Sequence, residues 1–327
     1  MSLLLNARFR AGPPGGVARV AALHASGLAR RLGGLEEVTP HAGENGWLWE
    51  QVSLRSAARG RMLLGFANLG PLYLRDQIVM IHDAQPFLAP GDYRLRQRVN
   101  FRLIWRNLAA NARLILTVSE HSRQALARAG VTGRAPVAVV PNGADHLQRV
   151  PARQPRGFKE AGPFALMIGS SKGYKNLARA VRGWRRAAID GGRLVIAGGP
   201  DPATYLGDAP VTWVPRPSDG EVRWLYQHAR LFILPSLTEG FGLPGVEAMA
   251  EGCPVAAARA GAMPEVLDDA ATWFDPHSEA DIATALSTLW AWEGVRTAQI
   301  ARGKDRVAAL SWSRAEERLY QALAPYL

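Results

Sequence analysis

The chain has 327 residues, of which 48% are hydrophobic and 20% charged, so it can bury globular cores and has the length of about two domains. Its single cysteine, Cys253, excludes an intramolecular disulfide, and no run of apolar residues is long enough for a membrane-spanning helix. The net charge of +11 favours anionic partners and equally fits a solvated, arginine-rich surface. Because the short apolar stretch at 2–6 does not resemble an export signal, we expect a cytoplasmic protein.

Short apolar runs alternate with amphipathic stretches, which predicts strands alternating with helices. In the first half we expect the strands Leu3–Asn6, Met62–Phe66, Ile78–His82, Leu114–Val118 and Val137–Val140, and the helices Val17–Leu32, Asp92–Asn111 and Glu120–Ala129. In the second half we expect the strands Phe164–Ile168, Leu194–Ala197, Leu231–Leu234, Val255–Ala258 and Thr272–Phe274, and the helix Leu177–Ala188. This alternation predicts an α/β fold with two doubly wound, Rossmann-like parallel sheets.

A segment rich in proline and glycine, 151–163, separates the two series and is interpreted as a linker. We therefore predict an N-terminal domain at 1–155 and a C-terminal domain at 156–310. Residues 311–327 are expected to form a terminal helix that returns to the first domain. Ligands of such sheets bind beyond the carboxyl ends of the strands, so the expected site is the cleft between the two domains.

The stretch 235–254 carries the most chemical information. Glu239 follows a buried strand, Gly240 and Gly242 then allow a tight turn, and Glu247 lies early in the helix that comes next. The free amides at the start of that helix suit a phosphate, and the two carboxylates suit sugar hydroxyls. A carboxylate that stabilises the helix dipole would explain Glu247 alone, but it would not explain the second acid before the glycine turn.

This stretch resembles the signature of family 4 glycosyltransferases, which have the GT-B fold. That signature is E-G-F-G-L-P followed by a second glutamate, with seven residues between the acids. The resemblance implies a retaining, metal-independent hexosyltransferase in which Glu239 lies against the transferred sugar and Glu247 binds the ribose of the nucleotide. The other donor-binding residues that it implies at this turn are Gly240, Phe241, Gly242 and Leu243.

Two glycine-containing loops resemble loops found in the same family. Gly15 and Gly16 resemble the glycine loop after the first strand and are expected to face the donor phosphate. Lys175 follows the first strand of the second domain and matches a lysine that similar enzymes place on the diphosphate. Many relatives carry an arginine directly before that lysine, whereas this chain has Tyr174, so we expect Lys172 to assist.

Segments of the first half extend the resemblance to bacterial enzymes that build surface polysaccharides, many of them mannosyltransferases. One is Trp-Glu-Gln at 49–51, and another begins at His82, which the resemblance places beside the sugar near the reacting centre. A buried histidine with only a structural role is the alternative for His82. Asp83, Arg19 and Asn142 are expected to support the acceptor or the site around it.

The donor expected first is GDP-mannose and the second is a UDP-sugar, with a saccharide or a lipid-linked saccharide as acceptor. The resemblance implies that the N-terminal domain is the acceptor side and that the C-terminal domain binds the nucleotide sugar. We expect no cofactor and no metal, since the sequence has neither a D-x-D motif nor a His and Cys cluster, and no nucleic-acid partner. Two alternatives stay open: a nucleotide-sugar 2-epimerase of the same fold, and a non-catalytic nucleotide-sugar-binding protein.

An arginine stripe recurs every fourth residue on the helix expected at 92–111. Its members are Arg94, Arg98, Arg102 and Arg106, with Trp105 beside them. The stripe is either a solvated helix face or a peripheral contact with the anionic inner face of the cell membrane.

Overall fold

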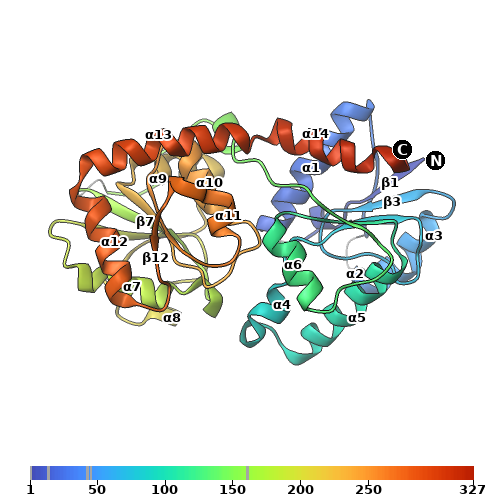
Figure 1. Cartoon of the computed structure of the whole chain (residues 1–327), viewed down its shortest axis with the longest axis horizontal. Helices are drawn as coiled ribbons and strands as arrows, with labels where there is room; N and C mark the ends of the chain where they lie inside the picture. Colours follow the sequence, from blue (N-terminus) through green and yellow to red (C-terminus); the bar gives the residue numbers. More distant parts are fainter. Residues whose placement is uncertain (1, 13–14, 42–43, 45, 160–161) are drawn as a thin grey trace. The chain divides into compact units, whose positions relative to one another are not determined.

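The computed structural model describes residues 2–12, 15–41, 44, 46–159 and 162–327. The chain divides into two compact units: Met1–Asn142 together with Trp312–Leu327, and Gly143–Ser311. Each unit is built around one six-stranded sheet in which all strands are parallel (Figure 1). The predicted α/β class with two doubly wound sheets is therefore confirmed. The roles expected for the two domains stay predictions.

The sheet of the first unit has the order β2-β1-β3-β4-β5-β6. Its strands are β1 (Leu3–Asn6), β2 (Glu36–Val38), β3 (Met62–Gly65), β4 (Gln77–Met80), β5 (Leu114–Thr117) and β6 (Val137–Val139). Its helices are α1 (Gly16–Leu32), α2 (Gly46–Trp49), the π-helical segment η2 (Glu50–Leu54), α3 (Arg55–Ala57), α4 (Gln85–Leu88), α5 (Leu95–Asn111), α6 (Glu120–Arg128) and α14 (Trp312–Leu323). Single 3-10 turns occupy Arg8–Arg10, Pro90–Asp92 and Ala324–Tyr326.

Helix α1 illustrates how the apolar pattern positions an element. Its buried residues recur at helical spacing from Val20 to Leu28, and the helix ends at Gly33, which has the left-handed φ of 71°. Helix α14 packs along α1, and the two helices lie side by side in Figure 1. The ring of Trp312 on α14 contacts the ring of His24 on α1 edge to face, at 5.2 Å between centroids.

Helix α5 begins later than the sequence pattern predicts. Residues 90–92 form a 3-10 turn and Arg94 is extended with φ −61° and ψ 146°, so the helix begins at Leu95 and not at Asp92. Proline and glycine in the preceding turn explain the difference, because they favour a turn over a continuous helix. The buried side of α5, which includes Trp105 and Leu108, packs with strand residues of β4 and β5.

The sheet of the second unit has the order β12-β11-β10-β7-β8-β9. Its strands are β7 (Phe164–Ile168), β8 (Arg193–Ala197), β9 (Thr212–Val214), β10 (Leu231–Leu234), β11 (Val255–Ala258) and β12 (Thr272–Phe274). Its helices are α7 (Leu177–Ala187), α8 (Ala203–Leu206), α9 (Asp219–His228), α10 (Leu243–Ala250), α11 (Met263–Leu267), α12 (Glu279–Ala291) and α13 (Glu293–Ala309). Single 3-10 turns occupy Leu147–Arg149, Gly173–Lys175 and Asp268–Ala270.

The strand order of each sheet reverses at one place. In the second unit the chain runs outward from β7 through β8 to β9 and then returns to β10 on the other side of β7. In the first unit the reversal lies between β1 and β3. Loops that leave the carboxyl ends of strands on the two sides of a reversal diverge and leave room for a ligand. The fold therefore offers one ligand position in each unit.

Candidate functional site

Lys175 and Glu239 meet at the strand reversal of the second unit. Lys175 ends the 3-10 turn that follows β7, and Glu239 lies in the loop that follows β10. Lys175 Nζ lies 2.6 Å from Glu239 Oε1, and the hydroxyl of Ser236 donates a hydrogen bond of 2.6 Å to the same oxygen. The side chains are 24% and 11% exposed, so the pair is accessible from one side. Both residues were predicted, but their contact and the role of Ser236 were not.

Backbone and amide hydrogen bonds fix the loop that carries Lys175. The side chain of Asn176 donates to the carbonyls of Pro235, at 3.1 Å, and of Pro276, at 2.8 Å. The amide of Leu237 donates to the carbonyl of Tyr174 at 2.7 Å. These hydrogen bonds join the loop after β7 to the ends of β10 and β12. They hold the ammonium group of Lys175 next to the carboxylate of Glu239.

Gly261 allows the loop of Glu239 to pack closely. Its φ is 60°, and an added Cβ would lie 2.5 Å from the backbone nitrogen of Glu239. The amide of the next residue, Ala262, donates to the carbonyl of Glu239 at 3.0 Å. Only glycine satisfies both the left-handed conformation and the close approach, so this position supports the placement of Glu239.

The turn predicted to bind the donor leads directly into α10. Gly242 precedes the helix with a φ of 80°, and Gly240 and Phe241 are buried while Leu243 is partly exposed. Pro244 occupies the second position of α10, where its missing N–H costs nothing. The sequence therefore folds locally as predicted, with the amide-rich end of α10 following the loop of Glu239.

Glu247 is buried on α10 and is held from two sides. His146 Nε2 lies 3.1 Å from Glu247 Oε1, and the Tyr226 hydroxyl donates to Glu247 Oε2 at 3.3 Å. All three side chains are buried. Glu247 was predicted as a donor-binding residue, but its two partners were not. Neither His146 nor Tyr226 belongs to a sequence motif that would predict a contact with α10.

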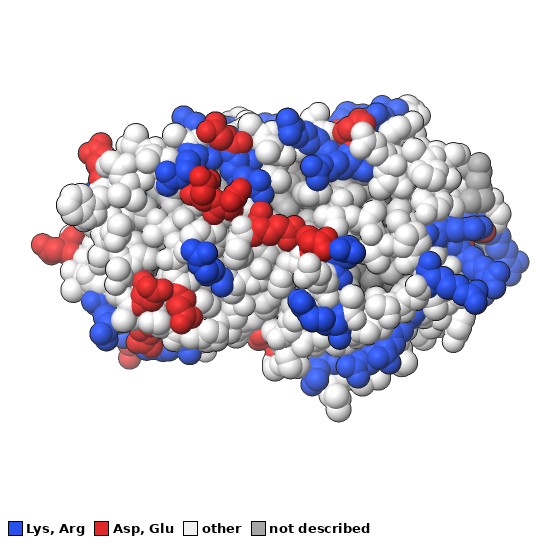
Figure 2. Space-filling view, viewed as in Figure 1, with Lys and Arg blue, Asp and Glu red and all other residues white. Residues whose placement is uncertain are grey.

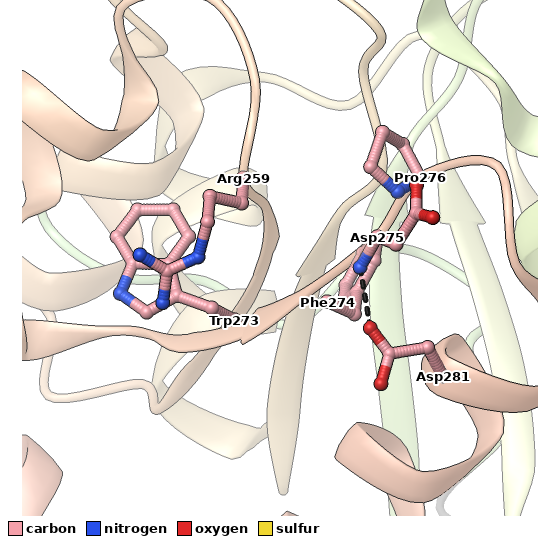
Figure 3. A pocket seen from close by; sticks show the side chains of 6 residues that line it. All are labelled: Arg259, Trp273, Phe274, Asp275, Pro276 and Asp281. Atoms are coloured by element: carbon pink, nitrogen blue, oxygen red, sulfur yellow. Dashed lines mark hydrogen bonds between the residues drawn. The ribbon is translucent and has the colours of Figure 1, made fainter.

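A cavity of about 360 Å³ lies at the carboxyl ends of β11 and β12 (Figure 3). The guanidinium of Arg259 lies over the ring of Trp273, 5.2 Å from its centroid. On the other side Asp281 Oδ2 accepts a hydrogen bond of 2.5 Å from the amide of Asp275. The next residue, Pro276, is the one bonded by Asn176, so this cavity adjoins the loop of Lys175. None of its lining residues was predicted.

In the first unit, Gly15 and Gly16 lie at the amino end of α1. Gly15 is extended and Gly16 begins the helix, and an added Cβ at either position would meet nothing within 4 Å. Both glycines line a cavity of about 410 Å³ at the strand reversal between β1 and β3. Arg19 lies on the first turn of α1, and its amide donates to the carbonyl of Gly15. That the two glycines face a donor phosphate stays a prediction.

His82 is buried at the end of β4. Its Nε2 donates to the carbonyl of Phe66 at 2.8 Å, and its backbone amide donates to Asn68 Oδ1 at 2.8 Å. Burial lowers the pKa of His82 to about 4, so the ring is neutral at pH 7. One ring nitrogen therefore has a structural partner, and the other keeps a lone pair for a ligand hydroxyl. Contact of His82 with the sugar stays a prediction.

The remaining predicted residues are Asp83, Asn142 and Lys172, each in a loop that follows a strand. Asp83 Oδ1 accepts from the amide of Gln85 at the start of α4. Asn142 is buried after β6, and its Oδ1 has no hydrogen-bond partner among the described residues. Lys172 is exposed directly before the turn that contains Lys175. Their predicted supporting roles are not tested by these contacts.

Within the described ranges, no three or more His, Cys, Asp or Glu side chains are grouped so that they could hold a metal ion. No described helix combines the length and apolar character needed to cross a bilayer.

Residues 149–306 match the model of the family "Glycosyl transferases group 1". This segment of the chain belongs to that family of glycosyltransferases. The resemblance to family 4 glycosyltransferases drawn from residues 235–254 is therefore confirmed.

Curated relatives of this chain include two proteins named as O-antigen chain mannosyltransferases. The O-antigen chain mannosyltransferase RfbU of Salmonella typhimurium is 26% identical over 227 residues, which cover 66% of this chain and 61% of RfbU. The O-antigen chain mannosyltransferase B of Escherichia coli is 29% identical over 74% of this chain and 68% of that protein. The chain thus spans about three fifths of the length of RfbU.

Solved structures share the fold of this chain over nearly its whole length. Sucrose-phosphate synthase from Thermosynechococcus elongatus superposes with a TM-score of 0.77 at 18% identity and covers 100% of this chain and 99% of its own. WaaG, a glycosyltransferase involved in lipopolysaccharide biosynthesis, gives a TM-score of 0.73 at 16% identity over 98% of this chain and 99% of its own. The predicted GT-B fold is confirmed.

Proposed function

We propose that this protein transfers a hexose from a nucleotide diphosphate sugar to a saccharide or a lipid-linked saccharide in polysaccharide biosynthesis, with retention at the anomeric carbon. The observation that carries the proposal is the Lys175–Glu239 pair at the strand reversal of the second unit. The bond that the reaction breaks joins the sugar to the diphosphate. At this position the carboxylate can face the sugar and the cation can face the diphosphate. Family membership supports the same reaction class.

Each side chain has a distinct task in this proposal. The bond between the anomeric carbon and a phosphate oxygen breaks, a bond from the anomeric carbon to the acceptor oxygen forms, and the acceptor proton passes to the leaving phosphate. Negative charge grows on the diphosphate, where Lys175 stabilises it, while Glu239 stabilises the positive charge that grows on the sugar ring. Ser236 keeps the carboxylate in place when the diphosphate draws Lys175 away.

The donor is recognised through its ribose and its diphosphate in the same proposal. Glu247 accepts hydrogen bonds from ribose hydroxyls, and the amides of Gly242 and Leu243 contribute to the diphosphate site along with Lys175. We propose GDP-mannose as the donor and a UDP-sugar as the second candidate, because two curated relatives are named as mannosyltransferases. No metal enters the mechanism, since the lysine and the backbone amides supply the positive charge.

Product analysis tests the proposal against its two alternatives. The protein is incubated with GDP-mannose or UDP-glucose, with and without a panel of glycosides, and the products are separated by mass spectrometry. Release of GDP or UDP together with a glycoside that has gained a hexose supports transfer. An epimerised nucleotide sugar formed without acceptor would identify a 2-epimerase. Donor binding without any product would identify a non-catalytic binding protein.

We also propose that α5 binds an anionic membrane surface, where lipid-linked acceptors are anchored. Apolar side chains repeat every fourth residue on its exposed face, and each follows an arginine, so the face is both apolar and basic. Leu95, Val99 and Leu103 are 70%, 47% and 62% exposed, beside Arg94, Arg98 and Arg102. In Figure 2, Lys and Arg gather where Figure 1 places α4 and α5, with few acidic residues among them. Acidic lipid headgroups complement this charge.

A further inference from the structure

The second unit has a further cavity of about 360 Å³, a volume within the range of roughly 300–1,000 Å³ that is typical of small-molecule sites. Its lining comes from segment 155–159 before β7, from Arg193 at the start of β8, and from residues 212–215 of β9 and its end. Lys175 and Glu239 lie in the loops after β7 and β10, and neither lines this cavity. The cavity is therefore distinct from the site at the strand reversal.

Three cationic residues and no acidic residue belong to the described lining of this cavity. The cations are Arg156, Lys159 and Arg193. Arg156 and Lys159 are exposed, and neither side chain forms an ion pair with another described residue. Glu221 accepts a hydrogen bond from the backbone amide of Arg156, but it does not line the cavity. Cations that gather without carboxylates repel one another, and a bound anion relieves this repulsion. The charge of the lining therefore favours an anionic ligand.

Aromatic rings hold the guanidinium of Arg193 in place. Its central carbon lies 5.4 Å from the ring centroid of Phe158 and 6.0 Å from that of Phe164. Its Nη2 donates to the carbonyl of Gly162 at 3.3 Å. Its Nη1 has no hydrogen bond with a described residue and is not buried, so these N–H groups are available to a ligand. Arg193 is thus a positioned cation with unused donors.

We propose that this cavity binds a phosphorylated small molecule, whose phosphate oxygens accept hydrogen bonds from Arg156, Lys159 and Arg193. A guanidinium matches the spacing of two phosphate oxygens, and a lysine adds a further charge. Apolar residues such as Pro155 and Val214 complete the lining and suit the sugar or base to which the phosphate is attached. The assignment does not rest on the proposed glycosyl transfer.

The test compares two double variants of the full chain that lose the same charge. Arg156→Gln with Lys159→Gln changes the cavity. Arg186→Gln with Lys304→Gln is the control, because both residues are exposed, have no partner among the described residues and do not line the cavity. Calorimetry in saturating GDP, which occupies the proposed donor site, measures the binding of glucose 6-phosphate, AMP and inorganic phosphate to each protein.

We expect one equivalent of glucose 6-phosphate or AMP to bind the wild type more tightly than inorganic phosphate does. The cavity variant should bind that ligand about 10-fold more weakly or worse, because two charged hydrogen-bond donors are lost. The control should stay within about 2-fold of the wild type, and both variants should keep the melting temperature of the wild type, since the replaced side chains are exposed.

Three results would overturn the assignment. One is a wild-type protein that binds neither ester more tightly than inorganic phosphate. Another is unchanged binding by the cavity variant, and the third is an equal loss in both variants, which would show attraction by net charge alone. Failure of GDP to bind would count against the proposed donor site, and the comparison of the two variants would still decide this assignment.

Discussion

Replacing Glu239 by glutamine removes the charge of the proposed sugar-binding residue and keeps its shape. The Oε1 atom that accepts from Ser236 and lies 2.6 Å from Lys175 has an equivalent in the glutamine side chain, so the loop should retain its geometry. The pair is partly exposed, and such ion pairs contribute roughly 0–1 kcal/mol to folding. We therefore expect Glu239→Gln to fold with a nearly unchanged melting temperature.

Catalysis should respond far more strongly than folding. Loss of one preorganised electrostatic contact at developing charge typically lowers kcat about 100- to 1,000-fold, which corresponds to roughly 3–4 kcal/mol. The affinity for the free nucleoside diphosphate should stay the same or rise slightly, because Lys175 is no longer held by a carboxylate. Initial rates of GDP release at saturating donor and acceptor give kcat, and calorimetry gives the nucleotide Kd.

A surface glutamate supplies the control for this variant. Glu279 pairs with Arg182 on the outer side of the second unit, at 2.5 Å, with both side chains about as exposed as ordinary surface residues. Glu279→Gln should leave kcat unchanged within about 2-fold. A Glu239→Gln variant with kcat near that of the wild type would refute the role of this carboxylate, and an equal loss in both variants would point to a folding defect.

Three further expectations concern the nucleotide, the pH and the membrane. His146→Gln should weaken GDP binding by about 5- to 10-fold through loss of one support of the ribose-binding carboxylate, with a smaller effect on 2′-deoxy-GDP; equal losses would contradict it. Burial lowers the pKa of His24 to about 3 and of His82 to about 4, so both rings gain protons on unfolding and stability should fall as the pH drops from about 6.5 toward 4. The free energy of unfolding, measured by urea titration, should fall by roughly 2 kcal/mol per histidine at pH 5. A free energy of unfolding that does not change with pH would exclude these histidines as a source of pH dependence. Vesicles with acidic lipids should bind the wild type and lose most binding to Arg98→Gln with Arg102→Gln, whereas neutral vesicles should bind neither.

Much of the fold follows from the apolar pattern, and the missed elements have physical reasons. The runs at β4 and β10 are buried at every position, as expected for central strands of parallel sheets. Strand β2 was not predicted because it lies at the edge of its sheet and its first residues, Glu36 and Glu37, are exposed. Strand β9 is also a short edge strand. Edge strands are not buried along their whole length, so they lack the continuous apolar run by which a strand is predicted from a sequence.

Some residues of the candidate site could be predicted from the sequence, and others could not. Lys175 and Glu239 could be predicted because each follows a buried strand, and parallel strands bring their carboxyl ends to one edge of the sheet. The partners His146 and Ser236 depend on side-chain geometry that no spacing rule provides.

A crystal structure with GDP-2-deoxy-2-fluoromannose, a donor analogue that resists transfer, tests the central claim most directly. We expect a diphosphate oxygen within hydrogen-bonding distance of Lys175 Nζ, the ribose hydroxyls on Glu247 and the hexose beside Glu239. The Lys175–Glu239 distance should then exceed the 2.6 Å found without donor. A nucleotide bound elsewhere, or bound here with its diphosphate away from Lys175 and its ribose away from Glu247, would contradict the account.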